Sequence, residues 1–359
     1  MPLVRKIAII GTQGIPARYG GFETLVENLI DHRSENIEYT VFCSSKDIGR
    51  KSDTYKGCRL RYIPLSANGI QSIPYDILSM LGAIRHFDTW LILGVSGCMA
   101  LPLLKIFYRN RIVVNIDGLE HRRAKWGRFA KWFLRKSEAM AVKYADAIIA
   151  DNKGIQDYVT EQYGKPSVLI GYGGDHAIKR MSENEQHEIL GRFGLTKHGY
   201  AITVCRIEPE NNCHIILEAF SATDKKLLFI GNWDRSEYGR SLKQKYGVCS
   251  NIILQSPIYD TKILYALRNN AETYVHGHSA GGTNPSLVEA MFFGRPVLAY
   301  DVIYNRATTD NKAAYFKDAA QLSSLLSQTY GNGCNDNLNE LARKEYTWKH
   351  ITELYETIY

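Results

Sequence analysis

The segment at residues 276–291 has the residue types and spacing of a diphosphate-binding turn. It follows a predicted strand, and Asn284 before Pro285 is typical of a helix N-cap and first helical position. We predict a helix from Pro285 to about Phe293, ending at Gly294. Backbone amides that precede a helix can bind a diphosphate. We therefore predict substrate contacts from His278, Gly281, Gly282, Thr283, Asn284 and Ser286.

Glu289 lies one turn inside this predicted helix. Its carboxylate could accept two hydrogen bonds from a ribose diol. The alternative is a solvated helix residue, which the apolar neighbours Leu287, Val288, Ala290 and Met291 disfavour. Two histidines, at positions 276 and 278, could suggest a metal. No third ligand accompanies them, so we predict no metal site.

Arg206 follows the first predicted strand of the second half of the chain. A guanidinium at the carboxyl end of a strand can hold a diphosphate in bidentate fashion and offset leaving-group charge. The alternative is a surface arginine paired with Glu208 or Glu210. Asn211 and Asn212 lie a few residues further on, and we predict that they also contact substrate.

A glycine-rich turn follows the first predicted strand. Gly20 and Gly21 lead into a predicted helix, whose amides and dipole favour a phosphate. The turn could also be one that glycine merely permits. Gly11 and Gly14 are too closely spaced for the G-x-G-x-x-G fingerprint, which argues against a nicotinamide-dependent dehydrogenase.

Alternating strand and helix patterns predict two doubly wound α/β domains, with helices notably at residues 22–30, 124–144 and 153–162. The predicted strands are Lys6–Gly11, Tyr39–Ser44, Leu60–Pro64, Trp90–Val95, Ile112–Ile116, Ala147–Ala150, Val168–Gly171, Ile202–Cys205, Leu227–Gly231, Ile252–Leu254, Thr273–His276 and Val297–Tyr300. Three glycines at 171–174 suggest a joint near 172–182. We predict domains at residues 1–175 and 176–347, with a C-terminal helix at 348–359 that crosses back to the first.

Composition agrees with two globular domains and excludes a disordered or coiled-coil chain, since 45% of the 359 residues are hydrophobic and 23% are charged. Residues 1–180 contain 26 Lys and Arg against 17 Asp and Glu, whereas the remainder contains 18 against 20. An anionic surface or substrate should therefore meet the first half. Seven cysteines without a C-x-x-C pair, no signal-peptide pattern and an apolar stretch at 90–104 too short to span a membrane indicate a cytoplasmic protein.

Four segments together resemble the retaining glycosyltransferases of the GT-B fold, in the family 4 group, and more narrowly a bacterial rhamnosyltransferase-like subgroup of capsule and O-antigen synthesis. The segments are 14–24, 117–120, 206–212 and 282–286. The resemblance implies two Rossmann-like domains facing a central cleft. It also implies transfer, with retention, of a hexose or 6-deoxyhexose from a nucleoside-diphosphate sugar. Rhamnose is the specific expectation, and the acceptor would be a growing cell-surface polysaccharide or lipid-linked oligosaccharide.

The sequence departs from the family pattern at two positions. Gly281 stands where the family has its first glutamate, and Asn211 stands where it usually has lysine. Asp117 lies near the family's acceptor-side histidine. Arg206, Asp117 and Glu289 are the expected catalytic residues, with no cofactor and no nucleic-acid partner. A sugar-nucleotide epimerase or a non-catalytic sugar-nucleotide-binding protein of the same fold remains the alternative.

Residues 122–136 contain seven basic residues and four aromatic ones. Trp126, Phe129, Trp132 and Phe133 recur at helical spacing, flanked by basic residues that include Lys125, Arg128 and Arg135. A basic amphipathic helix suits an anionic membrane surface, so peripheral contact with the inner face of the cell membrane is one expectation. The other is that the aromatic stripe packs on the sheet of its own domain.

Overall fold

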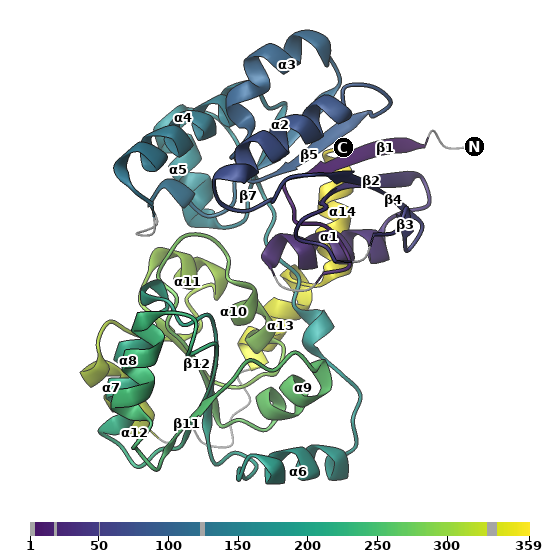
Figure 1. The fold of residues 1–359 in the computed structure, drawn as a ribbon. Helices are drawn as coiled ribbons and strands as arrows, with labels where there is room; N and C mark the ends of the chain where they lie inside the picture. Colours follow the sequence, from purple (N-terminus) through teal and green to yellow (C-terminus); the bar gives the residue numbers. More distant parts are fainter. Residues whose placement is uncertain (1–3, 18–19, 50, 123–125, 329–335) are drawn as a thin grey trace. The chain divides into compact units, whose positions relative to one another are not determined.

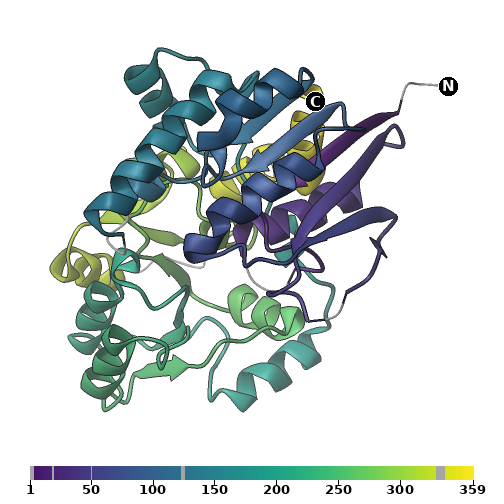
Figure 2. The ribbon, with the colours of Figure 1, turned by 45° about the horizontal axis from the view of Figure 1, so that its top comes forward.

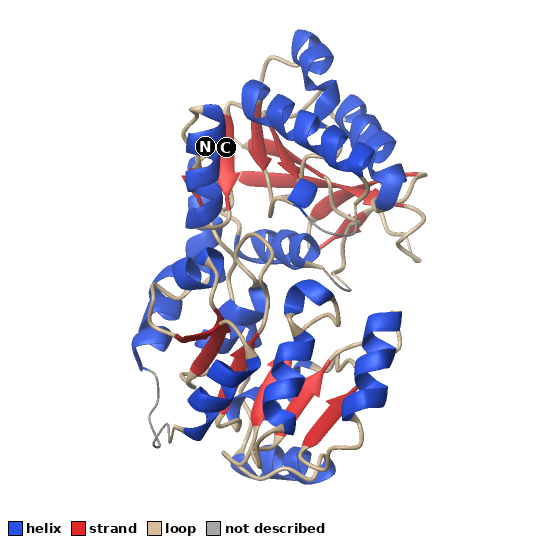
Figure 3. Cartoon of the chain, turned by 90° about the vertical axis from the view of Figure 1, so that its left-hand side faces the viewer, coloured by secondary structure: helices blue, strands red, loops and turns tan. Residues whose placement is uncertain are grey.

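The computed structural model describes residues 4–17, 20–49, 51–122, 126–328 and 336–359. The chain forms two compact units, each built around one twisted, largely parallel sheet (Figure 1). The first unit comprises Met1–Tyr172 and Trp348–Tyr359, and the second comprises Gly173–Thr347. In each unit helices cover the strands (Figure 3). The predicted fold class of two Rossmann-like α/β domains is confirmed.

The first sheet has eight strands in the order β3-β4-β2-β1-β5-β6-β7-β8. Its strands are β1 (Arg5–Ile10), β2 (Ile37–Ser44), β3 (Thr54–Tyr55), β4 (Cys58–Ile63), β5 (Thr89–Leu93), β6 (Arg111–Asn115), β7 (Ala147–Ala150) and β8 (Val168–Leu169). All neighbouring pairs are parallel except β3 and β4. Strand β5 is buried along its whole length, as expected of a parallel strand covered on both faces.

The helices of the first unit are α1 (Gly21–His32), α2 (Ser72–Gly82), α3 (Leu101–Phe107), α4 (Arg128–Tyr144), α5 (Lys153–Tyr163) and α14 (Trp348–Thr357). Short 3-10 turns are η1 (Gly69–Gln71), η2 (Cys98–Ala100) and η3 (Glu120–Arg122). Helix α14 lies beside α1 at the opposite end of the sequence (Figure 2). Trp348, Ile351 and Tyr355 of α14 are buried in the same core as strands β1 and β2.

The second sheet has six strands in the order β11-β10-β9-β12-β13-β14, all parallel. Its strands are β9 (Ala201–Val204), β10 (Leu227–Ile230), β11 (Ile252–Gln255), β12 (Thr273–His276), β13 (Val297–Tyr300) and β14 (Ala314–Phe316). Two separate apolar clusters lie in this unit, as expected for a sheet covered by helices on both faces.

The helices of the second unit are α6 (Glu183–Arg192), α7 (Cys213–Ser221), α8 (Glu237–Tyr246), α9 (Thr261–Asn269), α10 (Pro285–Met291), α11 (Ile303–Thr308), α12 (Ala319–Ser327) and α13 (Asp336–Glu345), with 3-10 turns η4 (Asp175–Ala177) and η5 (Pro209–Asn211). Helix α10 begins where predicted but ends at Met291 rather than near Phe293. A tight turn follows it and closes at Gly294, whose φ of 63° is left-handed.

Strand order reverses direction once in each sheet, between β1 and β5 in the first and between β9 and β12 in the second. Connections that leave two adjacent strands on opposite sides open a crevice at their carboxyl ends, which is where such sheets bind ligands. The predicted diphosphate-binding residues follow β9 and β12, and the predicted glycine turn follows β1. The fold therefore brings the second-unit candidates to one position.

Candidate active site

In the second unit, the loop after β9 and the loop after β12 are joined by side-chain hydrogen bonds. The Asn211 amide donates to the backbone oxygen of Arg206 at 2.7 Å. The carbonyl oxygen of the same amide lies 2.8 Å from Nδ1 of His278. Asn211 is almost completely buried. Asn211 thus fixes the Arg206 loop against the His278 loop.

The next residue along the chain makes a second connection between these loops. Nδ2 of Asn212 donates to the backbone oxygen of Gly277 at 2.8 Å, and the backbone N–H of Ser279 donates to the backbone oxygen of Glu210 at 2.8 Å. A Cβ on Gly277 would lie 2.1 Å from the backbone oxygen of Asn211, so glycine is needed for this close approach. The side chains of the two asparagines therefore hold the two loops together.

Arg206 extends from this joined pair of loops with its side chain 40% exposed. Its nearest carboxylate is that of Glu208, with Nη1 and Oε2 3.7 Å apart. At that distance and exposure the pair contributes little to stability. The guanidinium is thus accessible to an anionic group.

The start of α10 has the geometry expected from the sequence. Oδ1 of Asn284 accepts a hydrogen bond from the backbone N–H of Ser286 at 3.0 Å, which caps the helix. Gly282 has a φ of 86°, Thr283 is buried and Gly281 is half-buried. These residues belong, with His278, to the single connection between β12 and α10.

The carboxylate of Glu289 is held by two basic side chains. Its Oε2 lies 2.6 Å from Nη2 of Arg268, and its Oε1 lies 3.2 Å from Nε2 of His176. Burial would raise the pKa of Glu289, but Arg268 and His176 lower it to about 2. The carboxylate is therefore ionised, fixed and already engaged on both oxygens.

Sequence reasoning missed Arg268, a buried residue at the end of α9. Its Nε has no hydrogen-bond partner among the described residues. The sequence carried one indirect signal, since the apolar neighbours of Glu289 predicted a buried carboxylate, and a buried charge requires a partner. Nothing in the sequence identified which basic residue that partner would be.

In the first unit, an acidic side chain occupies the glycine turn. Oε1 of Glu23 accepts hydrogen bonds from Oγ1 of Thr12 at 2.9 Å and from the backbone N–H of Gln13 at 2.8 Å. Gly20 has a φ of 141°, and a Cβ there would lie 1.8 Å from Oε2 of Glu23. Gly21 begins α1. The carboxylate in the first turn of α1 thus occupies part of the position predicted for a phosphate, and this residue was not singled out from the sequence.

Asp117 lies just beyond the carboxyl end of β6 with a φ of 60°, a left-handed conformation that Asp tolerates better than most residues. Its backbone N–H donates to Oδ1 of Asn115 at 2.9 Å. Nδ2 of Asn115 in turn lies 2.9 Å from the hydroxyl of Tyr355 on α14. The C-terminal helix therefore helps to hold the Asp117 turn.

A second network fixes the segment that follows Asp117. The buried carboxylate of Glu138 on α4 lies 3.0 Å from Nδ1 of His121 and accepts from the hydroxyls of Tyr158 and Tyr163, both at 2.7 Å. Burial opposes ionisation of Glu138, but His121 and the two hydroxyls lower its pKa. This carboxylate therefore anchors η3 to α4 and α5.

The aromatic stripe of α4 divides in the structure. Phe129 is 77% exposed and Trp132 is 54% exposed, and their rings stack at a centroid distance of 5.8 Å, whereas Phe133 is half-buried. Arg128 and Arg135 are also exposed. Phe129 and Trp132 are therefore not part of an aromatic stripe that packs on the sheet.

The tryptophan before α4 has a different setting. Trp126 is half-buried, and its Nε1 donates to Oε2 of Glu120 at 3.0 Å. Lys125, expected to flank the stripe, lies outside the described residues. Trp126 therefore belongs with the η3 segment rather than with the exposed pair.

Among the described residues, no group of three or more His, Cys, Asp or Glu side chains could hold a metal ion. His276 is fully buried beside Tyr274 and His278, and burial lowers its pKa well below the usual value. In the part of the chain that the structure describes, no helix is long and apolar enough to cross a membrane.

Two family models match the sequence, one in each unit. Residues 185–323 match the model described as Glycosyl transferases group 1. Residues 4–175 match a model described as a domain of unknown function, DUF1972. Among curated proteins, none matches the sequence.

Several solved structures have the same fold along nearly the whole chain. Sucrose-phosphate synthase from Thermosynechococcus elongatus has a TM-score of 0.80 at 15% identity, covering 99% of this chain and 98% of that one. HepE from Anabaena in complex with UDP-glucose has a TM-score of 0.76 at 12% identity, covering 98% of both chains. A putative UDP-N-acetylglucosamine 2-epimerase from Listeria monocytogenes has a TM-score of 0.62 at 13% identity, covering 98% of this chain and 94% of that one. The chain therefore has the GT-B fold, and residues 185–323 of its second unit match the model described as Glycosyl transferases group 1.

Proposed function

We propose that the protein is a glycosyltransferase that moves a hexose or 6-deoxyhexose, specifically rhamnose, from a nucleoside-diphosphate sugar, with retention at the anomeric carbon. The acceptor is a growing cell-surface polysaccharide or a lipid-linked oligosaccharide. The second unit takes the donor, and the first unit presents Asp117 to the acceptor or the donor sugar. The proposed location is the cytoplasm, with peripheral contact at the inner face of the cell membrane.

One observation carries this proposal. At the point where strand order reverses in the second sheet, the loop with Arg206 and the loop that leads to α10 are fixed against each other by Asn211 and Asn212. An accessible guanidinium and the turn before a helix thus share a rigid support. That combination suits a diphosphate, and HepE, which has the same fold, has been solved with UDP and with UDP-glucose.

In the proposed reaction, the bond between the anomeric carbon and the diphosphate oxygen breaks, and a bond from that carbon to the acceptor hydroxyl oxygen forms. The hydroxyl proton is released, and the nucleoside diphosphate leaves with the bonding electron pair. Arg206 stabilises the charge that develops on the diphosphate. Glu289 accepts hydrogen bonds from the ribose, and Arg268 positions it by fixing its carboxylate. We propose that transfer needs no metal ion and no cofactor.

The test measures release of nucleoside diphosphate from a panel of nucleotide sugars, with and without a lipid-linked saccharide acceptor. Release that depends on both partners supports transfer. Arg206→Ala should abolish most of it, while Arg192→Ala should not. Arg192 is a matched control, because it is an exposed arginine of the same unit with one carboxylate partner, Glu188.

The same experiment separates the alternatives. An epimerase, favoured by the fold of the Listeria monocytogenes protein, would convert one nucleotide sugar into another without an acceptor. If the protein only binds nucleotide sugars, a bound nucleotide sugar would raise the melting temperature of the protein, but no nucleoside diphosphate would be released. Either result would contradict the proposed transfer.

A further inference from the structure

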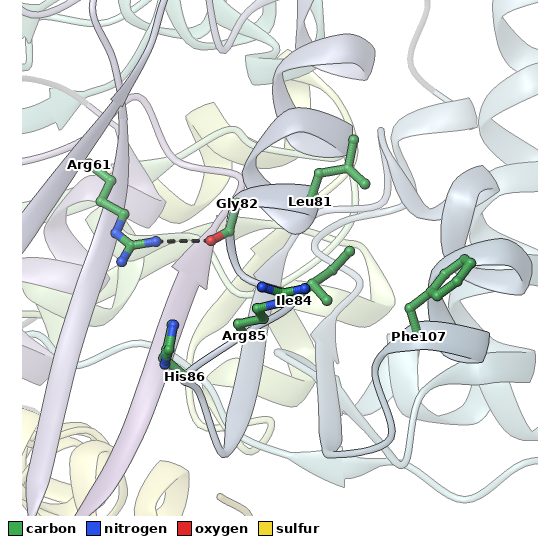
Figure 4. Close-up of a pocket in the computed structure, with 7 residues that line it drawn as sticks. All are labelled: Arg61, Leu81, Gly82, Ile84, Arg85, His86 and Phe107. Atoms are coloured by element: carbon green, nitrogen blue, oxygen red, sulfur yellow. Dashed lines mark hydrogen bonds between the residues drawn. The ribbon is translucent and has the colours of Figure 1, made fainter.

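A basic hollow lies on the first unit, away from the residues assigned to substrate. It has a volume of about 550 Å³ and lies among β4, the end of α2, the connection to β5 and the end of α3 (Figure 4). Its lining residues are Arg61, Leu81, Gly82, Ile84, Arg85, His86 and Phe107. Two guanidinium groups and three large apolar side chains thus share one small cavity.

Of the two arginines of the basic hollow, Arg61 is held in place by contacts with the surrounding structure. Nη1 of Arg61 donates to the backbone oxygen of Gly82 at 2.9 Å, and its guanidinium lies 5.5 Å from the ring centroid of Phe87. Arg85 is exposed on the connection that follows α2. Within the described parts of the chain, no carboxylate lies within ion-pair distance of either arginine. The two arginines that line the hollow can therefore attract a phosphate group.

Two exposed apolar side chains, Leu81 and Phe107, line the basic hollow, and further exposed apolar side chains lie on the same two helices. Leu103, Ile106 and Phe107 of α3 are 69%, 62% and 71% exposed. Leu78 and Leu81 on α2 are also exposed. Large apolar side chains gathered on adjacent turns of a surface helix mark an interaction site rather than ordinary surface. We call the surface formed by these five residues the α2–α3 face.

A second exposed apolar pair lies on the neighbouring helix α4. Helix α3 packs against α4, which carries Phe129 and Trp132 (Figure 1). The sequence alone pointed to α4 and not to α3, because α3 lies in a short apolar segment that reads as buried. A lipid carries an anionic phosphate next to its acyl chains, so a surface with basic and exposed apolar side chains near one another can contact both parts.

We infer that the α2–α3 face docks on an anionic phospholipid bilayer, with a lipid phosphate in the basic hollow and Leu103, Ile106 and Phe107 in the acyl boundary. Charge complementarity selects this occupant, because uncompensated arginines at an apolar surface suit anionic headgroups. The inference rests on the proposed function, because a lipid-linked acceptor gives the protein a reason to contact a membrane. The binding itself is a property of this surface and is measured without turnover.

The experiment is co-sedimentation of the full chain with phosphatidylcholine vesicles, with or without phosphatidylglycerol. Wild type should sediment with the anionic vesicles and remain in the supernatant with the neutral ones. Leu103→Ser/Phe107→Ser should lower vesicle binding more than tenfold. Arg85→Gln should lower it about fivefold at low salt and less at high salt.

Matched controls come from the second unit. Val248 and Ile303 are exposed apolar residues there, so Val248→Ser/Ile303→Ser should bind vesicles like wild type. Arg192→Gln removes one exposed arginine and serves as the charge control. Because all the replaced side chains are exposed, circular dichroism should show unchanged folding in every variant.

Three results would overturn the inference. Wild type could remain in the supernatant with both vesicle types. Phe129→Ser/Trp132→Ser could abolish binding while the α3 variant retains it. The α3 variant could change the mass of the lipid-free protein in sedimentation velocity, which would make the face an interface between copies. If no acceptor supports transfer but binding still depends on α3, the proposed function fails and this inference stands.

Discussion

Replacing Glu289 by Gln removes the negative charge that the structure places against the buried guanidinium of Arg268. The pKa of Glu289 falls from an ordinary value of 4.5 to about 2 because Arg268 and His176 overcome the effect of burial. At about 1.4 kcal/mol per pKa unit, ionised Glu289 stabilises the folded chain by about 3–4 kcal/mol. Loss of one partner from a buried ion pair typically costs about 3–5 kcal/mol. We therefore expect Glu289→Gln to lower the free energy of unfolding by about 3–4 kcal/mol at pH 7.

The pH dependence of this difference follows from the sign of the shift. The pKa of Glu289 is lower in the folded chain than in the unfolded one, so its stabilisation is fully present above pH 4.5. It is lost progressively as the pH falls toward about 2. The stability difference between wild type and Glu289→Gln should therefore shrink across that acidic window, provided the chain stays folded.

Urea denaturation of wild type, Glu289→Gln, Arg268→Met and the double variant measures the coupling. The double variant should recover most of the lost stability, because neither buried charge is then left alone. Calorimetry with UDP and other nucleoside diphosphates separates stability from binding. If Glu289 contacts ribose, the double variant should still bind more weakly than wild type, by about 1.5–3 kcal/mol.

Two outcomes would refute this reasoning. Equal stability of Glu289→Gln and wild type would show that the ion pair contributes nothing. Wild-type nucleotide affinity in the stable double variant would show that Glu289 and Arg268 are purely structural. In that case the ribose must be held by other residues.

Three further predictions concern charge, metal and pH. Arg206→Ala should lower turnover by about 10²–10³ while Arg192→Ala stays near wild type, and near-equal turnover in both would remove Arg206 from the site. Activity should persist in excess chelator, and an absolute requirement for magnesium or manganese would contradict the proposed metal independence. Burial raises the pKa of Asp76 on α2 to about 8, although the N–H of Gly97 opposes the shift. Wild type should therefore lose up to about 1.4 kcal/mol of stability per pH unit between about pH 4 and 8, and urea melts should show a flatter profile for Asp76→Asn.

The fold was predictable because parallel strands buried on both faces are short apolar runs bounded by glycine and polar residues. Strands such as β7 and β12 have the predicted bounds, as does the Asn284 cap of α10. The two-residue strand β3 was missed, because a pair of residues carries no periodicity. Its antiparallel pairing with β4 depends on a turn and not on an apolar pattern.

The partners of the candidate residues were less predictable. Arg268 and Glu289 lie on different helices, and their pairing depends on how α9 and α10 pack. Glu23 offered a better signal, since an acidic residue in the first turn of a helix commonly interacts with nearby N–H groups. Asn211 was noticed in the sequence as a departure from the pattern of the family that the chain resembles. Its contact with His278 could not be predicted, because it depends on how the two loops fold against each other.

The packing of α14 against the first unit also affects the order in which the two units can fold during synthesis. Strands β1 and β2 leave the ribosome early, but the core that they share with Trp348, Ile351 and Tyr355 stays open until residues 348–359 have been synthesised. The second unit has all its residues before that point and can fold first. The turn at Asp117, which Tyr355 supports through Asn115, is therefore among the last parts of the chain to be fixed. A nascent chain that stops short of α14 has a finished second unit beside an unfinished first one, with apolar surface exposed to chaperones and proteases.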